Sequence, residues 1–217
     1  MHTIRNYIMA ESLEQAWELN QKGRNNIIIG GNLWLKMGRR NIINAIDLSS
    51  LGLDKIEEDE GGFRIGCMAT LHDIETHEGL NKEFQNLFKE AVRHIVGVQF
   101  RNCATIGGSI FPKLGFSDVL TAFLACDTQV ILYKKGEVPL REFIYIPTDN
   151  DILTHLYVKK DGRKTAYESF RMTETDFPTI TCAMAKTQDG FETVLGARPK
   201  HAEVVVDEVV ADAFSSE

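Results

Sequence analysis

The sequence lacks long apolar runs, paired cysteines and an excess of basic charge, and each absence excludes a class of protein. No run approaches the roughly 18 to 20 apolar residues of a membrane-spanning helix, so we expect no membrane span. The four cysteines form no CxxC pair, which argues against a zinc ribbon or a sequence-local iron–sulfur cluster. The net charge of −7 argues against nucleic acid as a partner.

Two further absences concern location and catalysis. The first residues lack the charged, then apolar, then small-residue pattern of a signal peptide, and scattered cysteines suit a reducing compartment, so we expect a cytoplasmic protein. The six histidines show no metal-binding pairing, and neither a GxSxG nucleophile motif nor a catalytic triad is recognisable. We therefore expect no metal site and no catalytic acid or base.

The chain has 217 residues, 43% of them hydrophobic, which is enough for one large domain or two to three small lobes. Hydrophobic periodicity and turn signals predict an α+β protein with three lobes, at residues 1–55, 56–162 and 163–217. The expected helices are 13–20, 81–95, 117–126 and 202–214. The expected strands are 27–29, 43–47, 128–134, 151–160 and one around Tyr167, with hairpins at 54–66 and 179–197.

The first chemical candidate is the turn that follows the apolar run Ile27-Ile28-Ile29. A buried strand that ends at Gly30-Gly31 exposes backbone N–H groups, with no side chain to block close approach. Such groups suit a diphosphate, whose oxygens can accept several hydrogen bonds without a lysine. The alternative is a plain strand-terminating turn.

The second candidate, at residues 104–109, repeats the pattern of an apolar residue, two glycines and a small polar residue. Thr105 and Ser109 add hydroxyl groups that can bond phosphate or ribityl oxygens. Two such turns from different lobes could hold one diphosphate from both sides. Neither is a Rossmann GxGxxG motif or a P-loop. Beside this turn, Cys103 is expected to be a small buried thiol rather than a redox-active one.

The stretch QFRNCATIGGSI resembles the QxRNxATIGGNI signature of FAD-binding subunits in the molybdenum hydroxylase group, which includes xanthine dehydrogenase and carbon monoxide dehydrogenase. Other blocks resemble the same family in the same order: SLEQAWEL, IIIGGNLWL, NAIDLSSLGL, RIGCMATLHDIE and SDVLTAFLACDTQVIL. The resemblance covers nearly the whole chain. It implies a fold like that of the vanillyl-alcohol-oxidase group, in which two α+β lobes hold an extended FAD, followed by a short C-terminal lobe.

By position, the resemblance implies FAD contacts from both glycine turns and from three residues outside them. Ile95 would face the cofactor, although its helical spacing alone makes it a core position. Asp118 would contact the ribityl or phosphate region, or else compensate the charge of the helix N-terminus that Ser117 caps. The implied cofactor-binding residues are Ile27, Ile28, Ile29, Gly30, Gly31, Asn32, Leu33, Trp34, Ile95, Thr105, Ile106, Gly107, Gly108, Ser109, Asp118 and Arg171.

The chain departs from the family pattern at two of these places. Ser109 stands where the family has asparagine, and Ser169 stands roughly where the family often has a lysine close to the flavin ring. Arg171 is the nearest base, and a positive charge there would stabilise reduced, anionic flavin. The alternative for Arg171 is a solvated strand arginine. The C-terminal lobe is also shorter than the family pattern.

The resemblance implies a role in electron transfer. The chain would take electrons from the clusters of a [2Fe–2S] small subunit and pass them through FAD to NAD⁺ or another acceptor. Substrate hydroxylation would occur on a molybdopterin-binding large subunit, because nothing in this sequence could ligate molybdenum. Two alternatives keep the fold: an accessory or maturation protein that transfers no electrons, and a stand-alone flavin oxidase.

Overall fold

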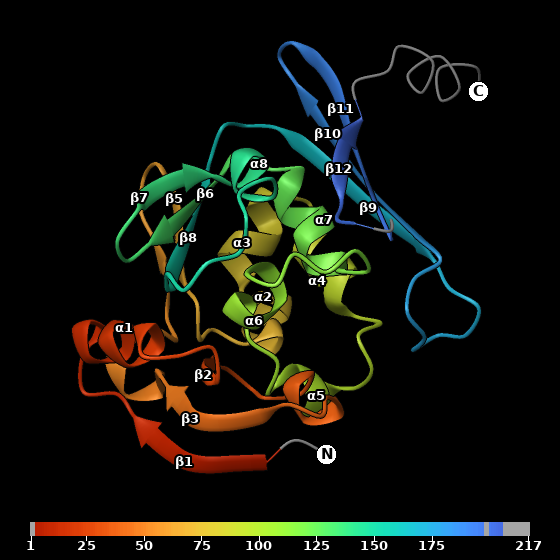
Figure 1. Ribbon diagram of the computed structural model, residues 1–217. Coiled ribbons are helices and arrows are strands. Elements are labelled where there is room, and N and C mark those ends of the chain that lie inside the picture. The colour runs from red at the N-terminus through yellow and green to blue at the C-terminus, as the bar shows by residue number, and fades with distance from the viewer. Residues whose placement is uncertain (1–2, 198–199, 206–217) are drawn as a thin grey trace.

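Three β-sheets, each built from one stretch of the chain, form the framework of the molecule (Figure 1). The structure is a computed structural model that describes residues 3–197 and 200–205. The first sheet is parallel and three-stranded, the second antiparallel and five-stranded, and the third antiparallel and four-stranded. Helices separate the second sheet from the third, so the predicted α+β class is confirmed.

The first sheet has the strand order β1-β3-β2 and is covered on one face by α1. Helix α1 begins after Ser12, whose hydroxyl oxygen accepts a hydrogen bond from the backbone N–H of Gln15 (3.1 Å), as the capping spacing predicted. Its buried face presents Ala16 to the sheet. The elements are β1 (Thr3–Met9), α1 (Leu13–Gln21), β2 (Asn26–Ile29), η1 (Leu35–Met37), β3 (Asn41–Asp47) and η2 (Ser49–Leu51).

The second sheet has the order β4-β5-β8-β6-β7, and short helices pack against it. A row of aromatic rings joins the sheet to these helices: Phe63, Phe84, Phe88 and Phe123 lie with successive ring centroids 6.2, 5.5 and 4.6 Å apart. The strands are β4 (Ile56–Glu58), β5 (Gly62–Gly66), β6 (Thr128–Leu132), β7 (Gly136–Pro139) and β8 (Leu153–Lys159). The helices are α2 (Leu71–Thr76), α3 (Glu78–Glu83), α4 (Leu87–Val92), α5 (Val98–Arg101), α6 (Ile106–Ile110), α7 (Asp118–Leu124) and α8 (Leu140–Phe143).

The single helix predicted over 81–95 is wrong, because two left-handed residues divide it into α3 and α4. Gln85 and Asn86 have φ values of 47° and 64°. The break is held by tertiary hydrogen bonds: the backbone N–H of Thr165 donates to Gln85 Oε1 (2.7 Å), and the Thr165 hydroxyl donates to the carbonyl of Phe84 (2.6 Å). Contacts with a strand eighty residues away thus override the helical periodicity.

The third sheet has the order β12-β11-β10-β9 and extends beyond the body of the molecule (Figure 1). The predicted hairpin is confirmed: β10 and β11 pair antiparallel, and Thr187 lies opposite Gly190. The closing helix predicted over 202–214 is wrong at its start, where residues 203–205 form an edge strand, and residues 206–217 lie outside the described residues. The strands are β9 (Lys164–Phe170), β10 (Ile180–Thr187), β11 (Gly190–Gly196) and β12 (Glu203–Val205).

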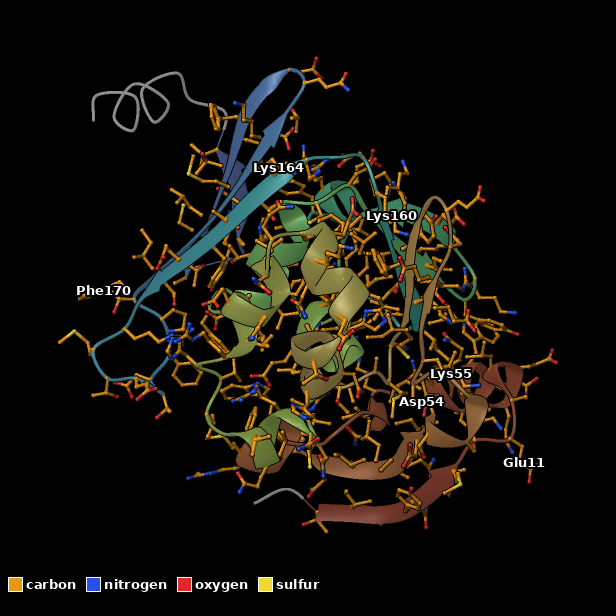
Figure 2. All side chains as sticks on the ribbon, turned by 180° about the vertical axis from the view of Figure 1, so that it is seen from behind. Glu11, Asp54, Lys55, Lys160, Lys164 and Phe170 are labelled. Atoms are coloured by element: carbon orange, nitrogen blue, oxygen red, sulfur yellow. The ribbon has the colours of Figure 1, made fainter. Side chains whose placement is uncertain are left out.

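One hydrophobic core runs through all three parts of the chain. It joins Ile46 of β3, Phe88 of α4 and Val194 of β11 in one continuous cluster. The chain passes from the first sheet to the second near Asp54 and from the second to the third between Lys160 and Lys164 (Figure 2). Because the core is shared, the lobe boundaries at 55/56 and 162/163 stay a prediction.

Candidate functional site

A cavity of about 830 Å³ lies where the first sheet, the helices and the β9–β10 connection meet. Apolar and polar groups from many segments line it, among them the end of β2, the turn before α6, the start of α7, and residues 171–178, which we call the strap. Among the expected cofactor residues, every one except Ile106 lies on its wall. Ile106 is fully buried in the core.

The first glycine turn, residues 30–33, presents free backbone donors to this cavity. Strand β2 ends at Ile29, and Asn32 adopts a left-handed conformation with φ 56°. Among the described residues, no protein group accepts a hydrogen bond from the N–H groups of Gly31, Asn32 or Leu33. Successive N–H groups around a left-handed residue form a concave anion site. The turn therefore provides hydrogen-bond donors that suit an anionic ligand.

The second glycine turn, residues 104–109, is the capped start of helix α6. Thr105 is its N-cap, and its hydroxyl oxygen accepts from the backbone N–H of Gly108 (3.2 Å). Ile106 N–H donates to the carbonyl of Ala69 (2.9 Å), and Gly107 N–H donates to the carbonyl of Cys67 (2.8 Å). The N–H of Ser109 donates within the helix to Thr105 (3.1 Å). The N–H groups of residues 106–109 thus all have protein partners, and in this turn only that of Thr105 has none among the described residues, so the two turns differ.

The paired glycines let the two turns touch each other. A Cβ on Gly31 would lie 1.6 Å from the carbonyl oxygen of Cys103, and one on Gly30 would lie 2.3 Å from Oγ1 of Thr105. Distances this short exclude any side chain. The first turn is therefore fixed against the second by direct backbone contact. Cys103 itself is exposed, so the predicted buried thiol is wrong, because its backbone rather than its side chain meets the first turn.

A buried ion pair also lies on the cavity wall. The side chains of Arg171 and Asp118 are 7% and 5% exposed, and Nη2 of Arg171 donates to Oδ1 of Asp118. Tyr167 donates to the same oxygen (2.5 Å). Burial, reinforced by the charge of Asp118, raises the pKa of Tyr167, which keeps its phenol protonated. The solvated alternative for Arg171 is wrong, since the start of α7 brings Asp118 to it.

Three aromatic rings form a cluster on the cavity wall. Phe177 of the strap lies 5.3 Å from Trp34 and 4.7 Å from Phe116, measured between ring centroids. Trp34 and Phe116 are 5.1 Å apart. Sequence reasoning missed Phe116, Phe177 and Tyr167, because no local pattern sets them apart from ordinary core or strand residues. Only the pairing of distant segments brings Phe116 and Phe177 to the cavity and Tyr167 to Asp118.

Two buried polar atoms on the cavity wall have no partner within the described part of the chain: Oδ1 of Asn32 and Nε of Arg171. Buried polar groups in folded proteins are nearly always hydrogen-bonded, so each of these atoms lacks a partner that water or a ligand could supply. No group of three or more His, Cys, Asp or Glu side chains suited to a metal occurs in residues 3–197 and 200–205. Over those residues, too, no helix is long and apolar enough to cross a membrane.

Comparison with known proteins identifies the family. Residues 2–158 match the family described as the FAD-binding domain in molybdopterin dehydrogenase. The chain is 26% identical to the protein YgfM of Escherichia coli K12, over 88% of this chain and 74% of that protein. It is 26% identical to the glyceraldehyde dehydrogenase medium chain of Sulfolobus acidocaldarius, over 86% of this chain and 71% of that one.

Solved structures show the same fold. A carbon monoxide dehydrogenase from Hydrogenophaga pseudoflava superposes with a TM-score of 0.80 at 22% identity, covering 92% of this chain and 76% of that chain. Quinoline 2-oxidoreductase from Pseudomonas putida 86 superposes with a TM-score of 0.81 at 17% identity, over 93% and 76%. The chain belongs to the family of FAD-binding subunits of molybdenum hydroxylases, a group of oxidoreductases, and its cofactor is FAD.

The residues of the cavity fit this cofactor. FAD carries two phosphates, ribityl and ribose hydroxyls, and two planar ring systems. The free N–H groups of Gly31, Asn32 and Leu33 suit phosphate oxygens. The apolar wall and the aromatic end suit a planar ring, and the unpartnered atoms of Asn32 and Arg171 suit polar edges of the ligand. The polarity and the hydrogen-bonding groups of the cavity lining thus fit FAD.

Proposed function

We propose that the chain is the electron-transferring FAD subunit of a xanthine dehydrogenase-like complex. It receives electrons from the [2Fe–2S] clusters of a small subunit and delivers them to NAD⁺ or another acceptor. A molybdopterin-binding large subunit hydroxylates the substrate. The observation that carries the proposal is the cavity itself, in which the expected cofactor residues converge around free N–H donors and two unpartnered polar atoms.

When bound, FAD supplies the chemistry, accepting and releasing the electrons, and the protein supplies binding and orientation. We assign the diphosphate to the backbone N–H groups of residues 31–33. The hydroxyl of Ser109, which donates to the carbonyl of Thr105 (2.9 Å), keeps lone pairs available on the cavity wall. Ile27, Ile28 and Ile95 belong to the apolar part of the wall. We assign no catalytic acid or base to this chain.

We place the complex in the cytoplasm. Each of the four cysteines is free, and Cys67 and Cys126 are buried. Burial raises the pKa of the Cys67 thiol to about 12, so it stays protonated and unreactive at neutral pH. Four unpaired thiols suit a reducing compartment, where disulfides do not persist.

Purification of the chain together with the proteins encoded beside it tests the proposal. We expect the complex to contain about one FAD per chain, iron and molybdenum, and its 450 nm flavin absorbance to bleach when NADH is added without oxygen. A complex that holds FAD, yet shows neither bleaching by NADH nor reoxidation by NAD⁺ after chemical reduction, would exclude NAD⁺ as acceptor.

The accessory role is the second candidate, and Ser169 in place of the family's lysine favours it. The same preparation separates the two functions. Flavin that exchanges electrons with neither the iron–sulfur clusters nor any offered acceptor would support the accessory role and contradict electron transfer. Oxygen consumption by the isolated chain would instead indicate a stand-alone oxidase.

A further inference from the structure

Strand β1 has an unpaired outer edge. Among the described residues it pairs only with β3, and it lies at the rim of the molecule, on the far side of β3 from β2 (Figure 1). The strand has 7 residues, none of them proline or acidic, and Arg5 is its only charged residue. Proteins usually protect such edges with proline, lysine, a bulge or a covering segment, because unpaired N–H and C=O groups bind other strands. The edge of β1 is therefore open to another strand.

The register of β1 on β3 shows which backbone groups are unpaired. At the start of this parallel ladder, the N–H of Thr3 donates to the carbonyl of Arg40 (3.3 Å). In a parallel pair, alternate residues direct both backbone groups to the same neighbouring strand, so residues 3, 5, 7 and 9 bond to β3. The N–H and C=O groups of Ile4, Asn6 and Ile8 point outward, where no described segment pairs with them.

We propose that β1 pairs antiparallel with β1 of a second copy of this chain, with the two-fold axis at Asn6. In this register Asn6 lies opposite Asn6, and Ile4 lies opposite Ile8, so every outward N–H and C=O of these residues gains a partner. The pairing needs no ligand, so it forms whether or not the chain binds FAD.

Neighbouring registers are less complementary. An axis at Arg5 would place the two Arg5 side chains opposite each other, and like charges directly opposite destabilise a strand pair. An axis at Tyr7 would place Ile4 opposite Ala10, whose N–H already donates to the carbonyl of Asp47 (2.9 Å). The axis at Asn6 avoids both conflicts.

A row of asparagines supports this register. Nδ2 of Asn6 donates to Oδ1 of Asn44 (3.0 Å), and Nδ2 of Asn44 donates to Oδ1 of Asn26 (2.9 Å). The row ends at the exposed edge with Asn6, whose Oδ1 accepts from no group among the described residues. Across the proposed axis, Nδ2 of each Asn6 can donate its second hydrogen to Oδ1 of the other. The row would then continue from one sheet into the other.

The other face of β1 is also complementary to itself. Tyr7 and Met9 are 57% and 52% exposed there, and the Tyr7 hydroxyl donates to Asp47, which holds the ring on the sheet. In the proposed register Arg5 of each copy lies opposite Tyr7 of the other, where a guanidinium can stack on the ring. The pairing thus covers exposed aromatic surface and places no like charges directly opposite each other.

Sedimentation equilibrium of the full chain with FAD present is the first test. Because one strand from each copy makes a small interface, we expect a reversible dimer that forms between about 1 and 300 μM chain. Asn6→Asp places two carboxylates opposite each other and should raise the Kd of the dimer about tenfold. Asn41→Asp, at an exposed residue of the central strand β3, adds the same charge away from the edge and should change the Kd less than about twofold. A wild type that stays monomeric, or equal Kd values for the two variants, would overturn the proposal.

The second test needs no variant. Amide hydrogen exchange of the wild-type chain is compared at low and high chain concentration. The amides of Ile4, Asn6 and Ile8 should exchange more slowly at high concentration, whereas those of Arg5 and Tyr7 should not change, because β3 already holds them. Exchange at residues 4, 6 and 8 that is independent of concentration would overturn the proposal. Protection that arises only when other subunits are added would assign the edge to one of them instead of a second copy.

Cross-linking tests the register. Opposite residues of an antiparallel pair have Cβ atoms about 4.5–5.5 Å apart, close enough for a disulfide after a small adjustment. In a Cys103→Ser background, which removes the exposed native thiol, Asn6→Cys should form a covalent dimer under mild oxidation. Ile4→Cys is the control, because it lies opposite Ile8 of the other copy and should stay monomeric. Cross-linking that is equal in the two variants, or absent from Asn6→Cys, would contradict the proposed pairing.

Discussion

The two glycine turns of this chain have nearly the same sequence pattern and different structures. The first follows a strand, and within the described residues the N–H groups of Gly31, Asn32 and Leu33 have no protein acceptor. The second begins a helix, and the N–H groups of residues 106–109 all donate to protein oxygens. We infer that the first turn binds the anionic part of the ligand and that the second supports it.

The difference arises from partners far away in the chain. The donors of Ile106 and Gly107 are taken by Ala69 and Cys67, in the segment between β5 and α2. The backbone of Cys103 lies against the first turn, but no oxygen of the described residues accepts from the N–H groups of Gly31, Asn32 or Leu33. A Gly-Gly pair thus lets other groups approach the backbone closely. The tertiary structure then determines whether the N–H groups of the turn bond to protein or to ligand.

The largest expected effect comes from forcing the two turns apart. In Gly31→Ala the new Cβ would lie 1.6 Å from the Cys103 carbonyl oxygen, so backbone must move, and we expect the free energy of unfolding to fall by more than about 3 kcal/mol. Gly23→Ala is the control, because nothing lies within 4 Å of its Cβ position. Unfolding in urea measures the free energy of unfolding of both variants. Equal stabilities would show that the turns are not in contact.

The next effect tests the supporting role of the second turn. Thr105→Ala removes the N-cap oxygen of α6, and we expect a loss of about 0.5–2 kcal/mol in the free energy of unfolding. Thr105→Ser keeps the oxygen and should retain most of the stability. If Thr105→Ala keeps full stability but binds FAD more weakly, Thr105 contacts the ligand. The second turn would then bind FAD rather than support the first turn.

A smaller effect tests the binding role of the first turn. Asn32→Gly keeps the left-handed backbone and removes the unpartnered amide, so we expect unchanged stability and a Kd for FAD about twofold to tenfold higher. The matched control is Asn86→Gly, at the other left-handed asparagine, which lies outside the cavity wall. Fluorescence titration distinguishes them. Equal Kd values for FAD in both variants would show that the Asn32 side chain does not contact FAD.

A further effect concerns a group that belongs to neither turn. Burial, and then the charge of Arg64, lowers the pKa of His155 from 6.5 to about 4. In the unfolded chain His155 therefore binds a proton below about pH 6.5, whereas in the folded chain it binds one only below about pH 4. The free energy of unfolding should fall as the pH drops through this window, and less steeply in His155→Gln. Identical slopes in urea unfolding between pH 7 and 4 would contradict this.

Much of this architecture is predictable from the sequence. Capping at Ser12 and Ser117, the apolar run at 27–29 and the hairpin at 179–197 are local signals, and the structure confirms each. Strand β1 has no such signal, because it is an edge strand with Tyr7 and Met9 exposed. The break between α3 and α4 depends on Thr165. The bonding of Arg171 likewise depends on segments fifty residues apart.

The most direct measurement of the central claim is amide hydrogen exchange in the ligand-free chain and after addition of FAD. The amides of Ile106 to Ser109 should exchange slowly in both states, because protein oxygens already hold them. The amides of Gly31, Asn32 and Leu33 should exchange quickly without FAD and slow markedly with it. Protection gained at residues 106–109 and none at residues 31–33 would contradict the account.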